Sequence, residues 1–343
     1  MDKIKRFIDC HIPVETCNLR CHYCYITQHR RFAAGLPRFS FTSDFIGRAL
    51  SKERLGGVCL FNFCAGGETM LMPELASYAA TLLGQGHFLM IVTNGTAGKR
   101  FDEMLKSPKM ELERLFFKFS FHFLELKKRN LLNHFVENVQ KVKNAGCSFT
   151  IEITPCDELV PYLDEIKAFC LPRFGALPHI TVARDERKPG ELPILTSCNK
   201  DEYVNIWNTF NSDLFSYKMS VFGIKRSEFC HAGDWSCYLH IAIGDMFQCY
   251  KSNYNQNIYK DIESPIEFVP IGNNCNENHC YNAHAFLSFG VIPELNAPSY
   301  SSLRNRICED GTEWLNPIMK SFMGSKLNES NQEYASVENE HVG

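Results

Sequence analysis

The chain has 343 residues, of which 45% are hydrophobic and 22% are charged. This length and composition predict one large globular domain with a smaller appended module, and they exclude a wholly disordered or fibrous protein. Its 36 Lys and Arg residues are balanced by 39 Asp and Glu residues, so charge gives no reason to expect nucleic acid as the main ligand.

Six apolar, strand-like runs alternate with helical patterns over residues 7–215. The runs are Phe7–Val14, Gly57–Phe63, His87–Thr93, Phe116–Phe123, Ser148–Thr154 and Pro178–Ala183. The helical patterns lie at 43–54, 73–84, 100–106, 125–145, 157–171 and 200–213. Such repeated strand–helix units predict an α/β fold with a parallel sheet and outer helices. Chemistry is then expected at the carboxyl ends of the strands.

The pattern changes near residue 220. Tyr238–Ile243 and Met246–Tyr250 flank Gly244-Asp245, which predicts a β-hairpin. From about residue 325 the chain is polar with little apolar periodicity, so a disordered, frayed tail is expected. The predicted organisation is a partial (β/α)6 TIM-like barrel at 1–215, a small cysteine-rich module at 216–324 and a tail at 325–343.

The sequence predicts a cytoplasmic protein with no membrane partner. It contains no uninterrupted apolar run of about 18 residues, and its first residues lack the apolar core and cleavage site of a signal peptide. The 16 cysteines are therefore expected in a reducing compartment, where disulfides are rare. This many thiols in that setting indicate metal or redox chemistry.

Cys17, Cys21 and Cys24 form a C-x3-C-x2-C triplet directly after the first predicted strand. Three thiolates so close in sequence can hold one side of an iron–sulfur cubane and leave one iron open to a small molecule. Zinc is the alternative, with His22 completing a set of three cysteines and one histidine. Three unliganded buried cysteines are a third possibility, which the loop position disfavours.

Two further motifs end the second and third predicted strands. They are Ala65-Gly66-Gly67-Glu68 and Thr93-Asn94-Gly95, and each alone is an ordinary turn sequence. Together with the cysteine triplet, which has Tyr23 before its last cysteine, they resemble the signature of the radical S-adenosylmethionine (radical SAM) enzymes. The resemblance covers about residues 7–215 and implies a [4Fe-4S] cluster held by the triplet, with S-adenosylmethionine bound at its open iron.

The residues that the resemblance implies for S-adenosylmethionine share a position at strand ends: Tyr23, Gly66, Gly67, Glu68, Thr93, Asn94, Ser120 and Glu152. It assigns the backbone beside Tyr23 to the adenine, and Glu68 with its two glycines to the amino group. Ser120 and Glu152 are candidates for the ribose or methionyl groups. An electron from a reductase or flavodoxin-type donor would generate a 5′-deoxyadenosyl radical that abstracts a substrate hydrogen.

A second set of cysteines, Cys230, Cys249, Cys275 and Cys280, brackets and follows the predicted hairpin. It resembles the auxiliary-cluster modules called SPASM and Twitch in the same superfamily, although its final C-x4-C spacing is wider than the usual C-x2-C. The resemblance implies a second [4Fe-4S] cluster on these residues. The alternative is a structural zinc site with the same ligands.

Several other residues are candidates for roles in a reaction. Cys237 in the hairpin and Cys156 after the fifth strand could each donate a hydrogen atom to a substrate radical, or pack in the core. His122 could act as an acid or base, or be a satisfied structural histidine. Arg184 and Arg187 could bind a substrate phosphate or carboxylate, or belong to a solvated loop.

The leading hypothesis is oxidation of a small molecule, such as a sugar, a nucleotide-linked sugar or an aminocyclitol, with the second cluster as electron acceptor. Radical epimerisation with a cysteine hydrogen donor and maturation of a ribosomal peptide are the alternatives. The peptide hypothesis is disfavoured because only Met1–Thr16 precedes the first cysteine, whereas many peptide-modifying relatives carry an N-terminal recognition domain. A non-enzymatic iron–sulfur or zinc scaffold is the hypothesis from a different class.

Overall fold

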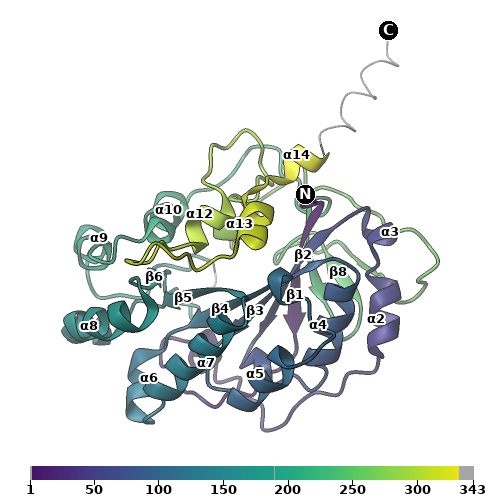
Figure 1. The fold of residues 1–343 in the computed structure, drawn as a ribbon. Coiled ribbons are helices and arrows are strands. Elements are labelled where there is room, and N and C mark those ends of the chain that lie inside the picture. The colour runs from purple at the N-terminus through teal and green to yellow at the C-terminus, as the bar shows by residue number, and fades with distance from the viewer. Residues whose placement is uncertain (1, 189, 332–343) are drawn as a thin grey trace.

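The computed structural model describes residues 2–188 and 190–331, and a nine-stranded sheet forms its centre in the order β6-β5-β4-β3-β2-β1-β7-β8-β9 (Figure 1). Six parallel strands precede residue 181: β1 Arg6–Ile12, β2 Cys59–Ala65, β3 Phe88–Thr93, β4 Leu115–Ser120, β5 Ser148–Ile153 and β6 His179–Ile180. This arrangement confirms the predicted α/β barrel fold.

Helices cover the outer face of these strands, as Figure 1 shows for α4 to α7. Their bounds are α1 Tyr25–His29, α2 Ser43–Ala49, α3 Lys52–Leu55, α4 Leu75–Gly84, α5 Gly98–Leu105, α6 Phe123–Lys128, α7 Leu132–Asn144 and α8 Leu163–Phe174, with 3-10 turns η1 Thr69–Leu71, η2 Leu112–Arg114 and η3 Asp157–Tyr162. Every second strand residue, such as Ile8, Phe61 and Phe117, packs in the core under these helices. The intervening residues, such as Phe7, Leu60 and Phe116, are buried on the other face, and burial of both faces explains why the strands read as apolar runs.

Two predicted helices are each divided. The helix predicted at 125–145 is α6 and α7, because Asn130 between them takes a left-handed backbone conformation with φ 58°. The helix predicted at 43–54 is α2 and α3, since Ser51 caps the second helix by accepting a hydrogen bond from the Arg54 amide. Both junctions use residues whose short polar side chains suit a break in a helix.

The second half of the chain extends the same sheet. It contributes α9 Lys200–Asn208, α10 Asp213–Val221, β7 Ser236–His240, β8 Asp245–Phe247, β9 Asn255–Asn257, α11 Ala283–Phe286, α12 Tyr300–Arg304, α13 Pro317–Gly324 and α14 Leu327–Asn331. The expected hairpin is β7–β8, with Tyr238 opposite Phe247. However, β7 also pairs in parallel with β1, with Cys237 opposite Ile8. The predicted boundary at 215/216 therefore falls inside α10, and the sheet continues across it.

The C-terminal helices cover the inner face of the barrel strands. Phe7, Leu60 and Phe88 belong to a second core together with Phe322 and Leu327. The rings of Phe88 and Phe322 are stacked, with their centroids 3.6 Å apart. The predicted tail is thus wrong for its first part, because apolar packing of Leu327 onto this core orders α14. Residues 332–343 of that prediction lie outside the described residues.

Polar residues replace apolar ones on the inner face toward the carboxyl ends of the strands. Asp9 and Asn62 are paired in register on β1 and β2, and Lys118 and Glu152 lie on β4 and β5. The barrel interior is therefore apolar at one end and charged at the other. No helix within residues 2–188 and 190–331 combines the length and apolar character needed to cross a bilayer.

Candidate active site

The first cysteine triplet and both glycine-containing motifs meet in one cavity, here called the first-site pocket. Its lining residues are Cys17, Leu19, Cys21, Cys24, Ile26, Phe32, Ala65, Gly66, Gly67, Glu68, Thr69, Val92, Thr93, Asn94, Ser120 and His122. The pocket lies at the carboxyl ends of β2, β3 and β4, because these three strands are parallel neighbours. The motifs that are far apart in the sequence are therefore adjacent in space.

At Gly67, the end of β2 packs closely against the chain segment that leads into Cys17. Its amide donates a hydrogen bond to the Val14 carbonyl oxygen over 2.6 Å, and the amide of Glu68 donates to the Thr16 carbonyl oxygen over 3.0 Å. A Cβ atom at Gly67 would overlap the backbone of Thr16. This position therefore needs glycine for close backbone approach within the chain itself.

Glu68 ties the ends of β2 and β3 together. Its carboxylate is 2% exposed and accepts hydrogen bonds from Thr93 Oγ1 (2.6 Å), the Asn94 amide (2.7 Å) and the Met70 amide (3.0 Å). Burial raises the pKa of this carboxyl, against the lowering effect of these donors. Both oxygens are used internally, so the assignment of Glu68 to the amino group of S-adenosylmethionine stays a prediction.

The thiols of the first site are buried enough to resist ionisation. Burial raises the pKa of the Cys17 and Cys24 thiols, and that of the Cys21 thiol to about 12. At Cys17, the Leu19 amide lies 3.4 Å from Sγ and Asn94 Nδ2 lies 3.8 Å from it, so both can donate to a thiolate. A bound metal cation would favour the thiolate forms, which these donors are placed to stabilise.

Tyr23 and His122 form a buried pair beside the triplet. The Tyr23 hydroxyl lies 2.7 Å from His122 Nδ1. Burial lowers the pKa of His122 to about 4, so its imidazole is neutral at pH 7. His122 and Ser120 line the first-site pocket, whereas Glu152 forms ion pairs with Lys118 and Arg304 on the inner face.

The His22 side chain contacts Glu158 and not the zinc ion that the zinc hypothesis places among the three cysteines. Its Nε2 lies 2.9 Å from Glu158 Oε2. Within the described residues, one group of three potential ligand atoms lies within 4.8 Å of one another, and it consists of His22, Cys156 and Glu158. Tetrahedral zinc–thiolate bonds would bring ligand sulfurs within about 4 Å of one another. The triplet is therefore spaced more widely than a single zinc ion requires.

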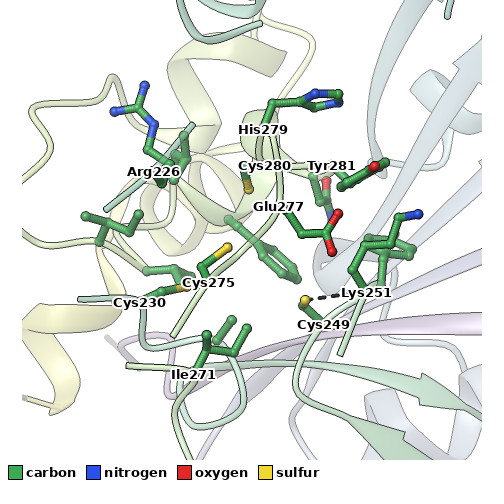
Figure 2. A pocket seen from close by; sticks show the side chains of 17 residues that line it. Arg226, Cys230, Cys249, Lys251, Ile271, Cys275, Glu277, His279, Cys280 and Tyr281 are labelled. Atoms are coloured by element: carbon green, nitrogen blue, oxygen red, sulfur yellow. Dashed lines mark hydrogen bonds between the residues drawn. The ribbon is translucent and has the colours of Figure 1, made fainter. Parts of the chain in front are cut away.

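The four cysteines of the second set also meet in one cavity, here called the second-site pocket (Figure 2). Cys230 forms a two-residue bridge with Gly272, Cys249 follows β8, and Cys275 and Cys280 lie in the segment before α11. The cavity also has an apolar wall built by Ala232, Ile271, Phe286, Leu287, Val291 and Ile292. The sequence therefore identified all four of the thiols that this pocket gathers.

The second-site thiols share the electrostatic character of the first. Burial raises the pKa of Cys230 and Cys280 to about 12 and also raises that of Cys249. The Lys251 amide donates toward Cys249 Sγ over 3.5 Å (Figure 2). As at the first site, these thiols form no group of ligand atoms within 4.8 Å in the described chain. A [4Fe-4S] cluster on these four cysteines stays a prediction.

A larger cavity of about 540 Å³, here called the interior cavity, lies between the two cysteine sites. It shares Ala65 with the first-site pocket. It shares Tyr250, Lys251, Tyr281 and Asn282 with the second-site pocket. Asp9, His11, Tyr25, Cys64 and Tyr238 line it as well. A molecule in this cavity would contact walls of both sites.

Asp9 is the buried carboxylate of the interior cavity, and it is 1% exposed. It accepts hydrogen bonds from the Tyr250 hydroxyl and from the side-chain amides of Asn62 and Asn282, the last two over 2.8 Å. Burial raises the pKa of Asp9 to about 6, although these donors oppose the shift. Tyr250 directly follows Cys249, so the network connects β1 to the second site.

Three of the remaining sequence candidates, Cys237, Cys156 and Arg187, do not line the cavities described above. Cys237 is 0% exposed and packs in the outer core, while its neighbour Tyr238 lines the interior cavity. Cys156 is also buried and lies beside His22. These places favour the packing alternative for both cysteines. The Arg187 guanidinium donates two hydrogen bonds to Asp185, and the side chain is largely exposed. Its partner in the arginine pair, Arg184, lines the interior cavity.

The polar residues of the inner face were not predicted from the sequence. Asp9, Asn62 and Lys118 each occupy an inward position in a strand that consists mostly of apolar residues. Alternate residues of a strand share one face of the sheet. A polar interior is therefore indicated when several neighbouring strands each carry a polar residue at an inward position. The strand register needed to use that signal comes from the structure.

The fold and the first site define a radical S-adenosylmethionine domain. Residues 11–155 match the model of the Radical SAM superfamily. The chain therefore contains a radical SAM domain over these residues. No curated protein sequence matches the chain.

SuiB and anSMEcpe share the fold of this chain at low sequence identity. SuiB of Streptococcus suis bound to its precursor peptide SuiA has a TM-score of 0.50 and 15% identity, over 76% of this chain and 64% of SuiB. Native anSMEcpe with bound AdoMet has a TM-score of 0.50 and 13% identity, over 75% of this chain and 79% of that protein. BtrN in complex with AdoMet and 2-DOIA has a TM-score of 0.38 and 13% identity, over 79% of this chain and 80% of BtrN. The chain thus spans about two thirds of SuiB.

Proposed function

We propose that the chain is a radical SAM enzyme that oxidises a small molecule in the interior cavity. The observation that carries this proposal is the position of that cavity, whose wall is shared with the first-site pocket on one side and with the second-site pocket on the other. Oxidation by two electrons needs a hydrogen-abstracting centre and an electron acceptor on either side of one substrate. The two cysteine sites offer such an arrangement.

The residues present fit the groups that the proposal needs. Cys17, Cys21 and Cys24 would hold a [4Fe-4S] cluster with one iron open, and the four second-site cysteines would hold an auxiliary [4Fe-4S] cluster. When bound, S-adenosylmethionine and the first cluster would supply a hydrogen-abstracting radical, and the auxiliary cluster would supply an electron acceptor. Tyr23, the two glycines, Thr93, Asn94 and Ser120 stay proposals for S-adenosylmethionine binding, and a reductase or flavodoxin-type donor stays a proposed partner.

Asp9 is placed to take the proton released by the oxidation. When a carbinol carbon loses a hydrogen atom and then an electron, its hydroxyl must also lose a proton to give a carbonyl. Asp9 lines the cavity, and its pKa of about 6 makes it ionised at pH 7 and close to the value of an efficient general base. The hydrogen bonds from Tyr250, Asn62 and Asn282 fix its orientation.

Radical epimerisation is a second candidate, because a thiol lines the same cavity. Cys64 on β2 is part of the cavity wall, unlike Cys237 and Cys156. It could return a hydrogen atom to a substrate radical. Incorporation of solvent deuterium into unoxidised product, lost in Cys64→Ala, would support epimerisation. The peptides bound to SuiB and anSMEcpe keep a peptide substrate as a further outcome of substrate screening.

The first experiment measures iron and 5′-deoxyadenosine after anaerobic reconstitution, reduction with dithionite and addition of S-adenosylmethionine. We expect about eight irons per chain from two cubanes, and 5′-deoxyadenosine from the wild type only. The control variant carries Cys17→Ala, Cys21→Ala and Cys24→Ala and should keep about four irons while losing the product. Zinc without iron after reconstitution would overturn the proposal.

A further inference from the structure

A fourth cavity, here called the lysine cavity, opens beside the interior cavity. Its volume is about 250 Å³, and Thr154, Thr181, Arg184, Lys218 and His284 contribute to its lining. It shares Arg184, Tyr281 and His284 with the interior cavity. None of its lining residues belongs to the first-site pocket. An anion bound here would therefore be a different group from the carboxylate of S-adenosylmethionine.

Cations outnumber anions around the lysine cavity. Glu152 is shared by Arg304 and Lys118, the latter at 3.3 Å. Arg184 has Glu186 at 3.2 Å. In the described part of the chain Lys218 has no carboxylate within 4.0 Å, and its ammonium donates to the hydroxyl of Thr181. Lys218 is therefore the cation for which the protein itself provides only a neutral partner.

The electric field of these cations acts on the groups between them. Burial and the neighbouring Lys118 lower the pKa of Lys218 well below its usual range, against the attraction of Glu152. Burial and the cations Lys218 and Arg304 likewise lower the pKa of His284. A partly buried cluster of like charges is unfavourable unless a counter-ion joins it. A bound anion would provide that counter-ion and keep Lys218 protonated.

We propose that Lys218 and Arg184 bind an anionic group of the substrate, a phosphate ester or a carboxylate, in the lysine cavity. The guanidinium can bind two oxygens of such a group and the ammonium acts as a point charge. The hydroxyls of Thr154 and Thr181 lie in the same wall. This inference rests on the proposed function. The remainder of the substrate would extend past the residues that the two cavities share and into the interior cavity, toward Asp9.

A rival use for these cations is compensation of the charge of a cluster at the second site. Cys280 lines both the lysine cavity and the second-site pocket, next to His279 and Tyr281 (Figure 2). Four thiolates around a cluster carry negative charge that Lys218 could offset. This alternative makes a different prediction: removal of Lys218 would change the reduction potential of the cluster and leave the binding of small anions unchanged.

The test is equilibrium dialysis of the reconstituted full chain with radiolabelled inorganic phosphate, and in parallel with acetate, at constant ionic strength. We expect saturable binding of at least one of these anions, at least tenfold weaker in Lys218→Gln. The matched control is Lys225→Gln, an exposed lysine in the segment after α10, which should bind like the wild type. Preference for phosphate or acetate identifies the class of anionic group.

Arg184→Gln is a second variant in case Lys218→Gln does not fold, and iron content with circular dichroism reports folding for both. Equal affinity in the wild type and in folded variants, or no saturable binding in the wild type, would overturn the anion site. A potential shift in Lys218→Gln with unchanged anion binding would assign the cations to the cluster instead. Because dialysis needs no turnover, its failure is distinguishable from a failure to form 5′-deoxyadenosine.

Discussion

The two cysteine sites use the same ligand type in different surroundings. The first site has three thiols, and its other walls carry glycines, a carboxylate, an amide and hydroxyl groups from β2, β3 and β4. The second has four thiols, and one of its walls is built by aliphatic and aromatic side chains. Polar groups that face a cavity can orient a ligand, whereas an apolar wall excludes water from what it encloses.

The two pockets differ in the number of thiols that they gather and in the polar groups that lie beside those thiols. A site with one thiol too few for a cubane has polar groups where an exchangeable small molecule would bind. The pocket with four thiols has Phe286, Val291 and Ile292 in one wall, and charged residues such as Arg226 and Glu277 elsewhere in its lining. Four substitutions test the two sites and the cavity between them, in order of decreasing expected effect.

Loss of two second-site ligands should empty that site and leave the first one working. Cys249→Ala with Cys280→Ala should lower the iron content from about eight to about four per chain, while 5′-deoxyadenosine still forms. Iron quantitation and product analysis measure both. The matched control is Cys237→Ala, because Cys237 is buried outside both sites, and it should keep all the iron. Loss of the product in the double variant would show that the sites are not independent.

Gly67→Ala should damage the first site selectively. The new methyl group would overlap the Thr16 backbone, so the segment entering Cys17 must move, at a cost of roughly 3 kcal/mol. Denaturant unfolding and first-site iron measure the loss. Gly84→Ala is the control, since a Cβ there meets no atom within 4 Å in α4 and should stabilise by about 0.5–1 kcal/mol. Normal iron in Gly67→Ala would contradict the packing role.

Asp9→Asn should change how stability depends on pH. The folded-state pKa of about 6 lies above the ordinary value of 3.8, so the wild type is stabilised below pH 4 and loses that stabilisation as the pH rises to 6. The free energy of unfolding should fall by about 3 kcal/mol over this range, because each unit of pKa difference for one group corresponds to about 1.36 kcal/mol. Urea unfolding at pH 4, 5, 6 and 7 should show it in the wild type and not in the variant. Parallel curves would refute the shift.

His22→Ala should have the smallest effect. His22 and Glu158 form an exposed pair, with side chains 48% and 59% accessible, and such pairs contribute less than about 1 kcal/mol. Iron at the first site should therefore be retained. If His22 were the fourth ligand of a zinc ion, the metal content of the first site would instead fall sharply in this variant. The control is His134→Ala, because His134 is another partly exposed histidine.

Much of the fold and both thiol sets could be predicted from the sequence because their signals are local. The strands read as apolar runs, the first cysteine set follows a strand, and the second set brackets and follows a hairpin. The radical SAM resemblance rested on three short motifs, and the family match over residues 11–155 supports it. The helix breaks at Asn130 and Ser51 were missed, since a single residue outweighs a long periodic pattern there.

The interior could not be predicted because its contacts join distant parts of the chain. The hydrogen-bond partners of Asp9 are 53, 241 and 273 residues away. Lys218 reads as an ordinary polar residue in a helix until α10 is placed against β6 and α11. In the same way, nothing local marks Leu327 as a core residue. Such contacts depend on strand order and on the packing of the C-terminal helices.

The position of β1 in the middle of the sheet has a consequence for synthesis. One of its edges binds β2, which follows within 60 residues, but its other edge binds β7, which begins at Ser236. A growing chain must therefore keep that second edge unpaired until more than two thirds of the protein has left the ribosome. A fragment ending near residue 215 would expose this edge together with Phe7, Leu60 and Phe88, and it should aggregate rather than fold as an independent barrel.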